Sequence, residues 1–424
     1  SYMAGGFSAA KEIIDRLILC DVPAGKPHNF DYKTALQELV QRKKDQVLRY
    51  ELIGESGPDH DKKFEVEVLL NGKPFYLNGT LDQAFNPTGF FTYPDEDETR
   101  AEAWRLKRLG LNMVRIHIKP EEPRKLYWMD KLGILVMEDI PCFWGAPNEE
   151  ARSAYENEWP EIIARDINHP STFAWVMFNE TWGLFTRKGN ERAYLPETQE
   201  WVRSVYHRAK EMDPTRLVED NSPCNRDHVE TDLNTWHFYI NGYNRVRNHI
   251  REAVEKAYPG SEFNFIGGNK QTDAPLMNSE CGLVWGVEGS AGDSDLAWQY
   301  HYMLNEYRLH EKLCGFVFTE FHDVVNEFNG YYRIDGEDKD FGYQDFCRGM
   351  TLRDLHAADF VAVDCAPMQN VNALERVTVP LYLSSFSDAL HGKACIAPSM
   401  STNTRPSLPS PPSQTAFRSR LPVS

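Results

Sequence analysis

The sequence predicts an α/β protein folded as a (β/α)₈ TIM barrel. Short, mostly apolar segments with the character of β-strands recur along the chain, and helical or polar segments separate them. The eight predicted strands are residues 75–79, 112–118, 134–140, 173–179, 216–220, 234–239, 275–279 and 315–319. Eight strand–helix units match the usual size of such a barrel. A doubly wound open sheet would need a glycine-rich phosphate turn after an early strand, and the sequence has none.

Helical or polar segments are expected between these strands. They are residues 98–109, 124–132, 151–167, 197–212, 245–257 and 296–313. Together with the strands they place the barrel domain at residues 64–370, which is long enough to have a hydrophobic core of its own.

The amino-terminal segment differs in character. Residues 1–63 are charged and favour helix, and we expect them to be an extension that remains from a preceding region. Within them, residues 31–52 have apolar side chains at roughly helical spacing, which predicts an amphipathic helix. Residues 64–70 alternate like a strand, and Asn71-Gly72 is a strong signal for a two-residue hairpin turn. The predicted hairpin therefore joins residues 64–70 to a return strand at 73–79.

The composition changes again near the carboxyl end. Residues 376–383 have the pattern of a strand, so we expect residues 371–396 to begin a further β domain. Residues 397–424 are rich in Ser, Pro and Thr with little apolar content, which predicts a disordered tail.

Bulk composition limits the classes of partner. The net charge is −17 at pH 7, which argues against nucleic acid, because phosphate binding favours a basic surface. No apolar run is long enough to span a membrane. The cysteines show no Cys-x-x-Cys spacing, so free thiols are expected rather than disulfides or zinc. We expect a carbohydrate substrate, no nucleic acid, no membrane and no cofactor; the oligomeric state and the cellular compartment stay open.

Two glutamates at strand ends are the strongest functional signal. Glu180 follows strand 173–179, and Glu280 follows strand 275–279. The carboxyl ends of barrel strands carry the catalytic groups, and two carboxylates facing one cleft are typical of glycosidic bond cleavage. We expect Glu180 to be the general acid, its pKa raised by burial beside Phe178 and Trp182. Glu280 would be the ionised nucleophile. The alternatives are a helix-start glutamate and a salt-bridged rim carboxylate.

Further polar residues lie at neighbouring strand ends. Arg115 and His117 are two apart, so both should face the barrel interior and position the nucleophile and a sugar hydroxyl. Tyr239 is expected to donate a hydrogen bond to Glu280, and His237 to hold a sugar hydroxyl; aromatic packing is the alternative for both. The other supporting candidates are Asp139, Asn179, Trp182, Trp285, Phe318 and Asp323. No metal-ligand spacing such as His-Glu-x-x-His is present, so no metal is expected.

These segments resemble the catalytic barrel of glycoside hydrolase family 2. Gly110-Leu-Asn-Met-Val-Arg-Ile-His117 resembles the family's second-strand motif, and Trp175-Val-Met-Phe-Asn-Glu180 resembles its acid/base signature. Asn278-Ser-Glu-Cys-Gly282 is similar to the segment that carries the family's nucleophile. The resemblance implies acid/base and nucleophile roles for Glu180 and Glu280. Phe318 stands where many members place a tryptophan under the sugar.

The expected activity is retaining hydrolysis of a terminal β-linked sugar, most like that of a β-galactosidase. A carbohydrate-binding or inactive barrel is the alternative from another class, and a metal-dependent barrel enzyme is a third. Asn269-Lys270 has the composition of a uronate-recognition pair, but it precedes Glu280 in the sequence instead of following it, and we interpret it as chance.

Overall fold

The computed structural model describes residues 48–56, 63–70, 75–189, 191–282, 293–325 and 327–387, with side chains from residue 75 onward except at 188, 293–295 and 346. The chain divides into two compact units, Ser1–Pro74 and Phe75–Ser424. Trp285 and the tail at 397–424 lie outside the described residues. None of the helices in the described ranges is long and apolar enough to cross a membrane.

The first unit contains an antiparallel pair of strands, β1 (Leu48–Ser56) and β2 (Lys63–Leu70). The predicted pairing of residues 64–70 with 73–79 is therefore wrong. Residues 48–52 are also strand instead of the predicted helix, because Leu48, Tyr50 and Leu52 alternate with charged residues, which is the strand period. Residues 31–47 and the Asn71-Gly72 turn lie outside the described residues.

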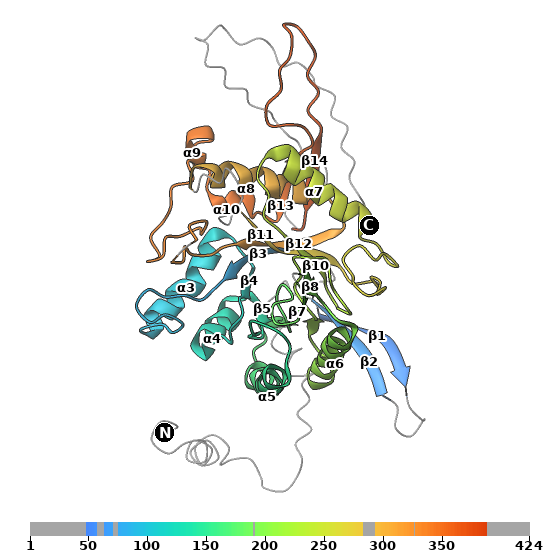
Figure 1. The fold of residues 1–424 in the computed structure, drawn as a ribbon. Coiled ribbons are helices and arrows are strands. Elements are labelled where there is room, and N and C mark those ends of the chain that lie inside the picture. Colours follow the sequence, from blue (N-terminus) through green and yellow to red (C-terminus); the bar gives the residue numbers. More distant parts are fainter. Residues whose placement is uncertain are drawn as a thin grey trace. The chain divides into compact units, whose positions relative to one another are not determined.

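The second unit is built around a sheet of eight parallel strands (Figure 1). In the order in which they pair, the strands are β10 (Asn234–Phe238), β11 (Leu276–Gly282), β12 (Leu313–Thr319), β3 (Leu77–Asp82), β4 (Met113–Ile116), β5 (Leu135–Asp139), β6 (Thr172–Val176) and β9 (Leu217–Glu219). Each predicted strand is found within a few residues of its expected position. The eightfold α/β prediction is confirmed.

The sheet curls until hydrogen bonds join its two end strands. Val218 in β9 accepts a backbone hydrogen bond from Asp232, just before β10, at 3.0 Å, and its own amide donates to the Asp232 carboxylate at 2.8 Å. Thr235 in β10 donates to Glu219 in β9, and the His237 amide donates to the Pro223 carbonyl at 3.0 Å. Because β9 is short, these contacts replace a regular ladder between the end strands.

Helices alternate with the strands and cover the outer face of the sheet (Figure 1). They are α3 (Glu96–Leu109), α4 (Pro123–Leu132), α5 (Glu149–Asp166), α6 (Pro196–Met212), α7 (Tyr243–Lys256) and α8 (Asp293–Arg308). Local sequence sets their ends. Asp95 caps α3 by accepting from the Glu98 amide, and Gly110 ends it with a left-handed φ of 81°. The predicted helices are found at these places.

Smaller elements complete the second unit. They are the pair β7 (Thr186–Lys188) and β8 (Glu191–Ala193), the short helices α9 (Tyr343–Phe346) and α10 (Leu352–Leu355), and the antiparallel pair β13 (Asp359–Val363) and β14 (Leu381–Ser385). The strand predicted at 376–383 overlaps β14 only at residues 381–383, because residues 376–380 are not strand; its partner β13 contacts α8.

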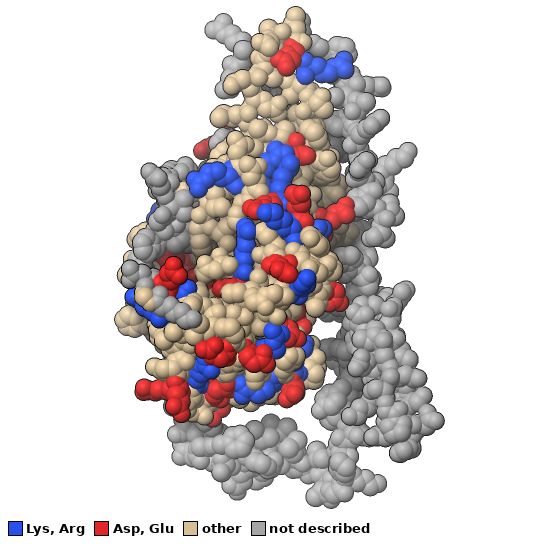
Figure 2. All heavy atoms as spheres, turned by 45° about the vertical axis from the view of Figure 1, so that its right-hand side comes forward, with Lys and Arg blue, Asp and Glu red and all other residues tan. Residues whose placement is uncertain are grey.

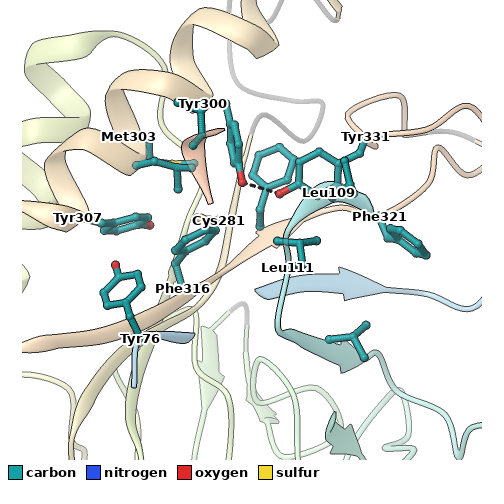
Figure 3. Close-up of a cluster of buried hydrophobic side chains, with 14 of the residues drawn as sticks. Tyr76, Leu109, Leu111, Cys281, Tyr300, Met303, Tyr307, Phe316, Phe321 and Tyr331 are labelled. Carbon is teal, nitrogen blue, oxygen red and sulfur yellow. Dashed lines mark hydrogen bonds between the residues drawn. The ribbon is translucent and has the colours of Figure 1, made fainter. Parts of the chain in front are cut away.

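Side chains separate into an inner and an outer core by strand alternation. Leu81, Met113, Met137, Met277 and Val317 share the cluster inside the barrel. The alternate positions pack outward against the helices, where rings from β12 and α8 meet (Figure 3). There the hydroxyls of Tyr300 and Tyr331 are 2.6 Å apart (Figure 3).

The outer surface in Figure 2 shows acidic and basic side chains interspersed. Many of them form ion pairs along the helices, such as Arg208–Glu156 at 2.6 Å and Lys210–Asp232 at 2.8 Å. Solvent-exposed pairs of this kind contribute little to stability, so burial in the two cores is the main source of the barrel's stability.

A close backbone approach between β3 and β12 generates a stability prediction. A Cβ added at Gly315 would lie 2.4 Å from the Leu77 Cβ and 2.5 Å from its carbonyl oxygen. Gly315→Ala should therefore force the two strands apart and lower the free energy of unfolding by about 1–3 kcal/mol. Urea-induced unfolding measures this change.

Gly133, at the end of α4, serves as the matched control. It has a left-handed φ of 65° and no heavy atom within 4 Å of an added Cβ. Asn tolerates this conformation, so Gly133→Asn should cost less than about 1 kcal/mol. Equal losses of unfolding free energy in Gly315→Ala and Gly133→Asn would contradict the close approach of β3 and β12.

Candidate active site

Glu180 and Glu280 lie at the same end of the barrel. One carboxylate oxygen of each residue and one ring nitrogen of His237 all lie within 4.8 Å of one another. His237 lies between the two glutamates, with Nδ1 2.9 Å from Glu180 Oε1 and 3.4 Å from Glu280 Oε2. The two acidic residues singled out from the sequence are therefore brought together.

The backbone at Glu180 is held in an uncommon conformation. Glu180 and Thr181 have left-handed φ values of 51° and 60°, which are costly for residues with a Cβ. Neighbouring groups compensate: the Glu180 amide donates to the Ser222 carbonyl at 2.8 Å, and the Thr181 amide donates to Asn221 Oδ1 at 2.9 Å. Thr181 Oγ1 also donates to Asp227 at 2.6 Å. These bonds turn the Glu180 side chain towards the barrel axis.

Glu280 is buried and surrounded by donors. The Tyr239 hydroxyl donates to Glu280 Oε1, as predicted, and Arg115 Nη1 lies 3.4 Å from Oε2. Burial, followed by the charge of Glu280, raises the pKa of Tyr239 well above its usual value, so the phenol keeps the proton that it donates. Thr319 Oγ1 lies 3.2 Å from the same hydroxyl. Glu280 is therefore held by a phenol hydroxyl and a guanidinium from neighbouring strands.

Arg115 is completely buried beneath the site. Its Nε and Nη2 donate to the two oxygens of Asp139, both at 2.9 Å, and Nη2 also donates to Asn179 Oδ1 at 2.7 Å. Burial lowers the pKa of Arg115, but the charges of Asp139 and Glu280 outweigh it and raise the pKa above its usual value. The predicted inward direction of Arg115 is found. His117 lies beside it, with Nδ1 3.3 Å from Asp139 Oδ2.

The pKa of Glu180 differs from the sequence expectation. Burial raises it, but the hydrogen bond and charge of His237, with a further hydrogen bond from Trp182, outweigh burial and lower the pKa to about 2. The expected raised pKa of Glu180 is therefore wrong. Phe178 does not cover the carboxylate, because strand alternation turns its ring outward onto Tyr155, at 4.6 Å between centroids. Trp182 does contact it, through Nε1 to Oε2 at 3.1 Å.

Two other expected residues have contacts outside the glutamate pair. Phe318 faces the outer core, where its ring contacts Tyr300 at 4.6 Å, because alternation along β12 turns Thr319 inward instead. Asp323 accepts from the Gly330 amide and from Lys339, which organises the segment after β12. The position of Phe318 in the outer core does not agree with a direct contact to a sugar between the glutamates.

Sequence analysis missed two serines that support His237. Ser222 Oγ lies 2.9 Å from His237 Nε2 and donates to Ser279 Oγ at 2.8 Å. Ser222 ends the polar run Glu219-Asp-Asn-Ser222 directly after β9, so the strand-end signal that identified Glu180 was present here too. Ser279 precedes Glu280 within β11 and gave no separate signal.

Both ring nitrogens of His237 have polar neighbours. Nδ1 faces the two glutamates, whereas Nε2 lies 3.3 Å from Arg115 Nη1 and 2.9 Å from Ser222 Oγ. Glu180, His237 and Glu280 are the one group of three in the described ranges with the spacing to hold a metal ion. Because His237 Nδ1 lies near both carboxylates, the arrangement also fits proton transfer.

Sequence comparisons identify two different segments. A family model described as "Glycosyl hydrolases family 2, TIM barrel domain" matches residues 63–346, and one described as "Double-stranded RNA binding motif" matches residues 32–78. The matches overlap at 63–78. The structure divides this overlap, because β2 pairs with β1 whereas Leu77 and Asn78 belong to the barrel strand β3.

The relatives show the same division. A "Ribonuclease 3" of Listeria welshimeri is 38% identical over 73 residues, 17% of this chain and 32% of its own length. A "Putative beta-glucuronidase" of Formosa agariphila is 22% identical over 258 residues, 58% of this chain and 31% of its own length. The chain thus spans about a third of the length of these curated relatives.

A solved structure agrees with the barrel. The β-galacturonidase of Eisenbergiella tayi bound to galacturonate superposes with a TM-score of 0.55 at 18% identity, over 73% of this chain and 54% of that one. The likeness at this identity concerns the fold. Because the family model covers more than half of the sequence and the fold agrees, the chain belongs to family 2 of the glycosyl hydrolases, with the TIM barrel domain of that family.

Proposed function

We propose that this protein hydrolyses the bond of a terminal β-linked sugar with retention of configuration. The observation that carries the proposal is the closeness of the Glu180 and Glu280 carboxylates, whose oxygens come within 4.8 Å. Retaining enzymes hold their two carboxyl groups about 5–5.5 Å apart, whereas inverting enzymes leave about 6.5–9.5 Å for a water. The short separation supports the retaining arrangement.

Glu280 is proposed as the nucleophile. It accepts a hydrogen bond from Tyr239 and lies beside the Arg115 guanidinium, and both contacts stabilise its anion. Its attack on the anomeric carbon would form a covalent glycosyl-enzyme while Glu180 protonates the departing oxygen. Glu180 would then remove a proton from the water that releases the sugar.

Glu180 must carry a proton when the substrate binds, and His237 controls that proton in our proposal. The His237 Nδ1–H donates to Glu180, and this bond together with the charge of His237 lowers the pKa of Glu180. The same N–H lies 3.4 Å from Glu280 Oε2. A small rotation of the imidazole would transfer the hydrogen bond to Glu280, which frees Glu180 to take up a proton.

The sugar is proposed from the relatives together with the sequence. The named relatives are a putative β-glucuronidase and a β-galacturonidase, so a β-uronide is the first candidate, and the β-galactoside expected from the sequence is the second. Asn269 and Lys270 do not help this choice. They line a cavity with Leu217 and Pro275, at the start of β9 and just before β11, which is the end of the barrel opposite Glu180.

Nucleophile rescue tests the two roles. Glu280→Gly should abolish turnover of aryl β-glucuronides or β-galactosides, and azide should partly restore it by giving the α-glycosyl azide. Glu180→Ala should mainly slow substrates with poor leaving groups, and azide should then give the β-glycosyl azide. Proton NMR of the products distinguishes the two anomers.

Reversed anomers would mean that the two roles are exchanged. An unaltered protein that binds these glycosides but turns none of them over would favour the alternative from the sequence, a carbohydrate-binding barrel without activity.

The control of Glu180 by His237 predicts a shift in pH dependence. His237→Gln keeps an amide donor but removes the ring whose charge lowers the pKa of Glu180. The pKa of Glu180 should rise, and since the protonated acid is the active form, the basic limb of the kcat/KM profile should move to higher pH. The control His207→Gln, on the exposed face of α6, should leave the profile unchanged. An unshifted basic limb in His237→Gln would contradict this role.

We propose a second function, double-stranded RNA binding, for the amino-terminal segment. The match at residues 32–78 and the likeness to Ribonuclease 3 support it. The overall charge of −17 does not describe this segment, in which eight Lys or Arg residues balance eight Asp or Glu residues. The expectation of no nucleic acid was drawn from the average of the whole chain, which hides local differences.

A gel-shift assay with the full chain tests RNA binding. The protein should bind an RNA duplex longer than about 16 base pairs more tightly than the same DNA duplex, because such domains recognise A-form shape and 2′-hydroxyls. Affinity should fall as salt rises. Charge reversal at Arg42, Lys43 and Lys44 should weaken binding at least about tenfold, whereas Lys131→Glu on α4 should not. Equal affinity for RNA and DNA would contradict the proposal.

A further inference from the structure

Trp144 is an exposed aromatic residue beside the proposed acid. It lies in the segment between β5 and α5 and is 75% exposed. Its ring packs against that of Trp182 in a tilted arrangement, with 4.5 Å between centroids and 42° between planes. Trp182 in turn donates from Nε1 to Glu180 Oε2 at 3.1 Å. A continuous aromatic surface therefore runs from the carboxylate to solvent.

The two oxygens of Glu180 face different neighbours. Oε1 faces His237, and through it Glu280, whereas Oε2 faces Trp182. In the proposed reaction the sugar that is attacked lies against Glu280, and Glu180 protonates the oxygen that leaves. The group attached to that oxygen must extend away from Glu280, and the aromatic surface lies on that side of Glu180.

The segments that carry the two tryptophans are packed together. Gly183 has a left-handed φ of 78°, and a Cβ there would lie 2.4 Å from the Phe143 carbonyl oxygen. Only glycine fits this approach, which brings the residue after Trp182 against the residue before Trp144. On the other side, the Arg192 guanidinium lies 5.2 Å from the Trp182 ring centroid. The geometry therefore holds Trp182 in place and leaves Trp144 as the exposed member of the pair.

We propose that Trp144 and Trp182 form a subsite for the leaving group, which takes a six-membered ring attached to the glycosidic oxygen. The apolar face of a sugar ring and an aryl ring share this chemistry, and both stack on indole. The subsite rests on the retaining β-glycosidase function proposed above and deepens it. It makes Trp144 a specificity-determining residue and not a catalytic one.

Binding to the Glu280→Gln variant tests the subsite without turnover. Isothermal titration calorimetry would compare methyl and 4-nitrophenyl β-D-glucuronides, methyl and 4-nitrophenyl β-D-galactosides, and lactose. For the sugar that binds, the ligand with a ring in its leaving group should bind about tenfold more tightly than the methyl glycoside. Adding the Trp144→Ala substitution should reduce the affinity for that ligand to the affinity for the methyl glycoside. The affinity for the methyl glycoside itself should stay unchanged. Trp144→Phe should keep most of the gain.

Trp104→Ala provides the matched control, because Trp104 is 54% exposed but lies on α3. The Trp104→Ala substitution should leave the affinity for every ligand unchanged. Thermal melts should show that every variant is folded. A gain with lactose as well as the nitrophenyl glycosides assigns the subsite to sugar rings, and a gain with nitrophenyl alone assigns it to aryl groups. A ring advantage that survives Trp144→Ala, or no ring advantage at all, overturns the subsite alone. Failure of all five ligands to bind overturns the proposed function and the subsite with it.

Discussion

The buried guanidinium of Arg115 organises the catalytic end of the barrel. From β4 it reaches Asp139 on β5, Asn179 after β6, and both the Ser279 carbonyl and the Glu280 carboxylate on β11. A fully buried cation is stable only when such partners compensate its charge, and the loss of one partner from a buried pair costs about 3–5 kcal/mol. Arg115 and its polar partners at the strand ends therefore depend on one another for stability. The same network that neutralises Arg115 also sets the direction of Glu280.

Glu180 is positioned in a different way, by its backbone. Two consecutive left-handed residues, Glu180 and Thr181, would be unstable in an isolated segment. Ser222, Asn221 and Asp227, which follow β9, supply the hydrogen bonds that hold them. Glu280 is thus positioned by the charge of Arg115, and Glu180 by hydrogen bonds from the segment after β9. His237 connects the two arrangements, because its Nδ1 lies 2.9 Å from Glu180 Oε1 and 3.4 Å from Glu280 Oε2.

The amino-terminal segment shows how averages over a chain mislead. A net charge of −17 describes the whole sequence, yet residues 32–78 are balanced in charge and match a double-stranded RNA binding motif. The family matches overlap where β2 gives way to β3, and only strand pairing separates them. The two parts of the chain carry separate proposals, because charge-dependent binding responds to the local field within about a Debye length and not to the total.

The sequence by itself determined the barrel and the two glutamates. Apolar strands at regular intervals and carboxylates at strand ends are local signals, and parallel strands place their carboxyl ends on one rim. It also indicated that Arg115 faces inward and that Tyr239 meets Glu280, because alternation and strand adjacency follow from the same pattern.

Only the tertiary structure decided the remaining features. Residues 64–70 can pair with any suitable alternating segment. They pair with residues 48–56 and not with 73–79, because β3 is already paired with β12 in the barrel. The low pKa of Glu180 and the contact of the Trp144 ring with the Trp182 ring arise from groups distant in sequence. Electrostatic and aromatic contacts depend on distances of a few ångströms between separate strands and loops, and no local sequence pattern encodes such distances.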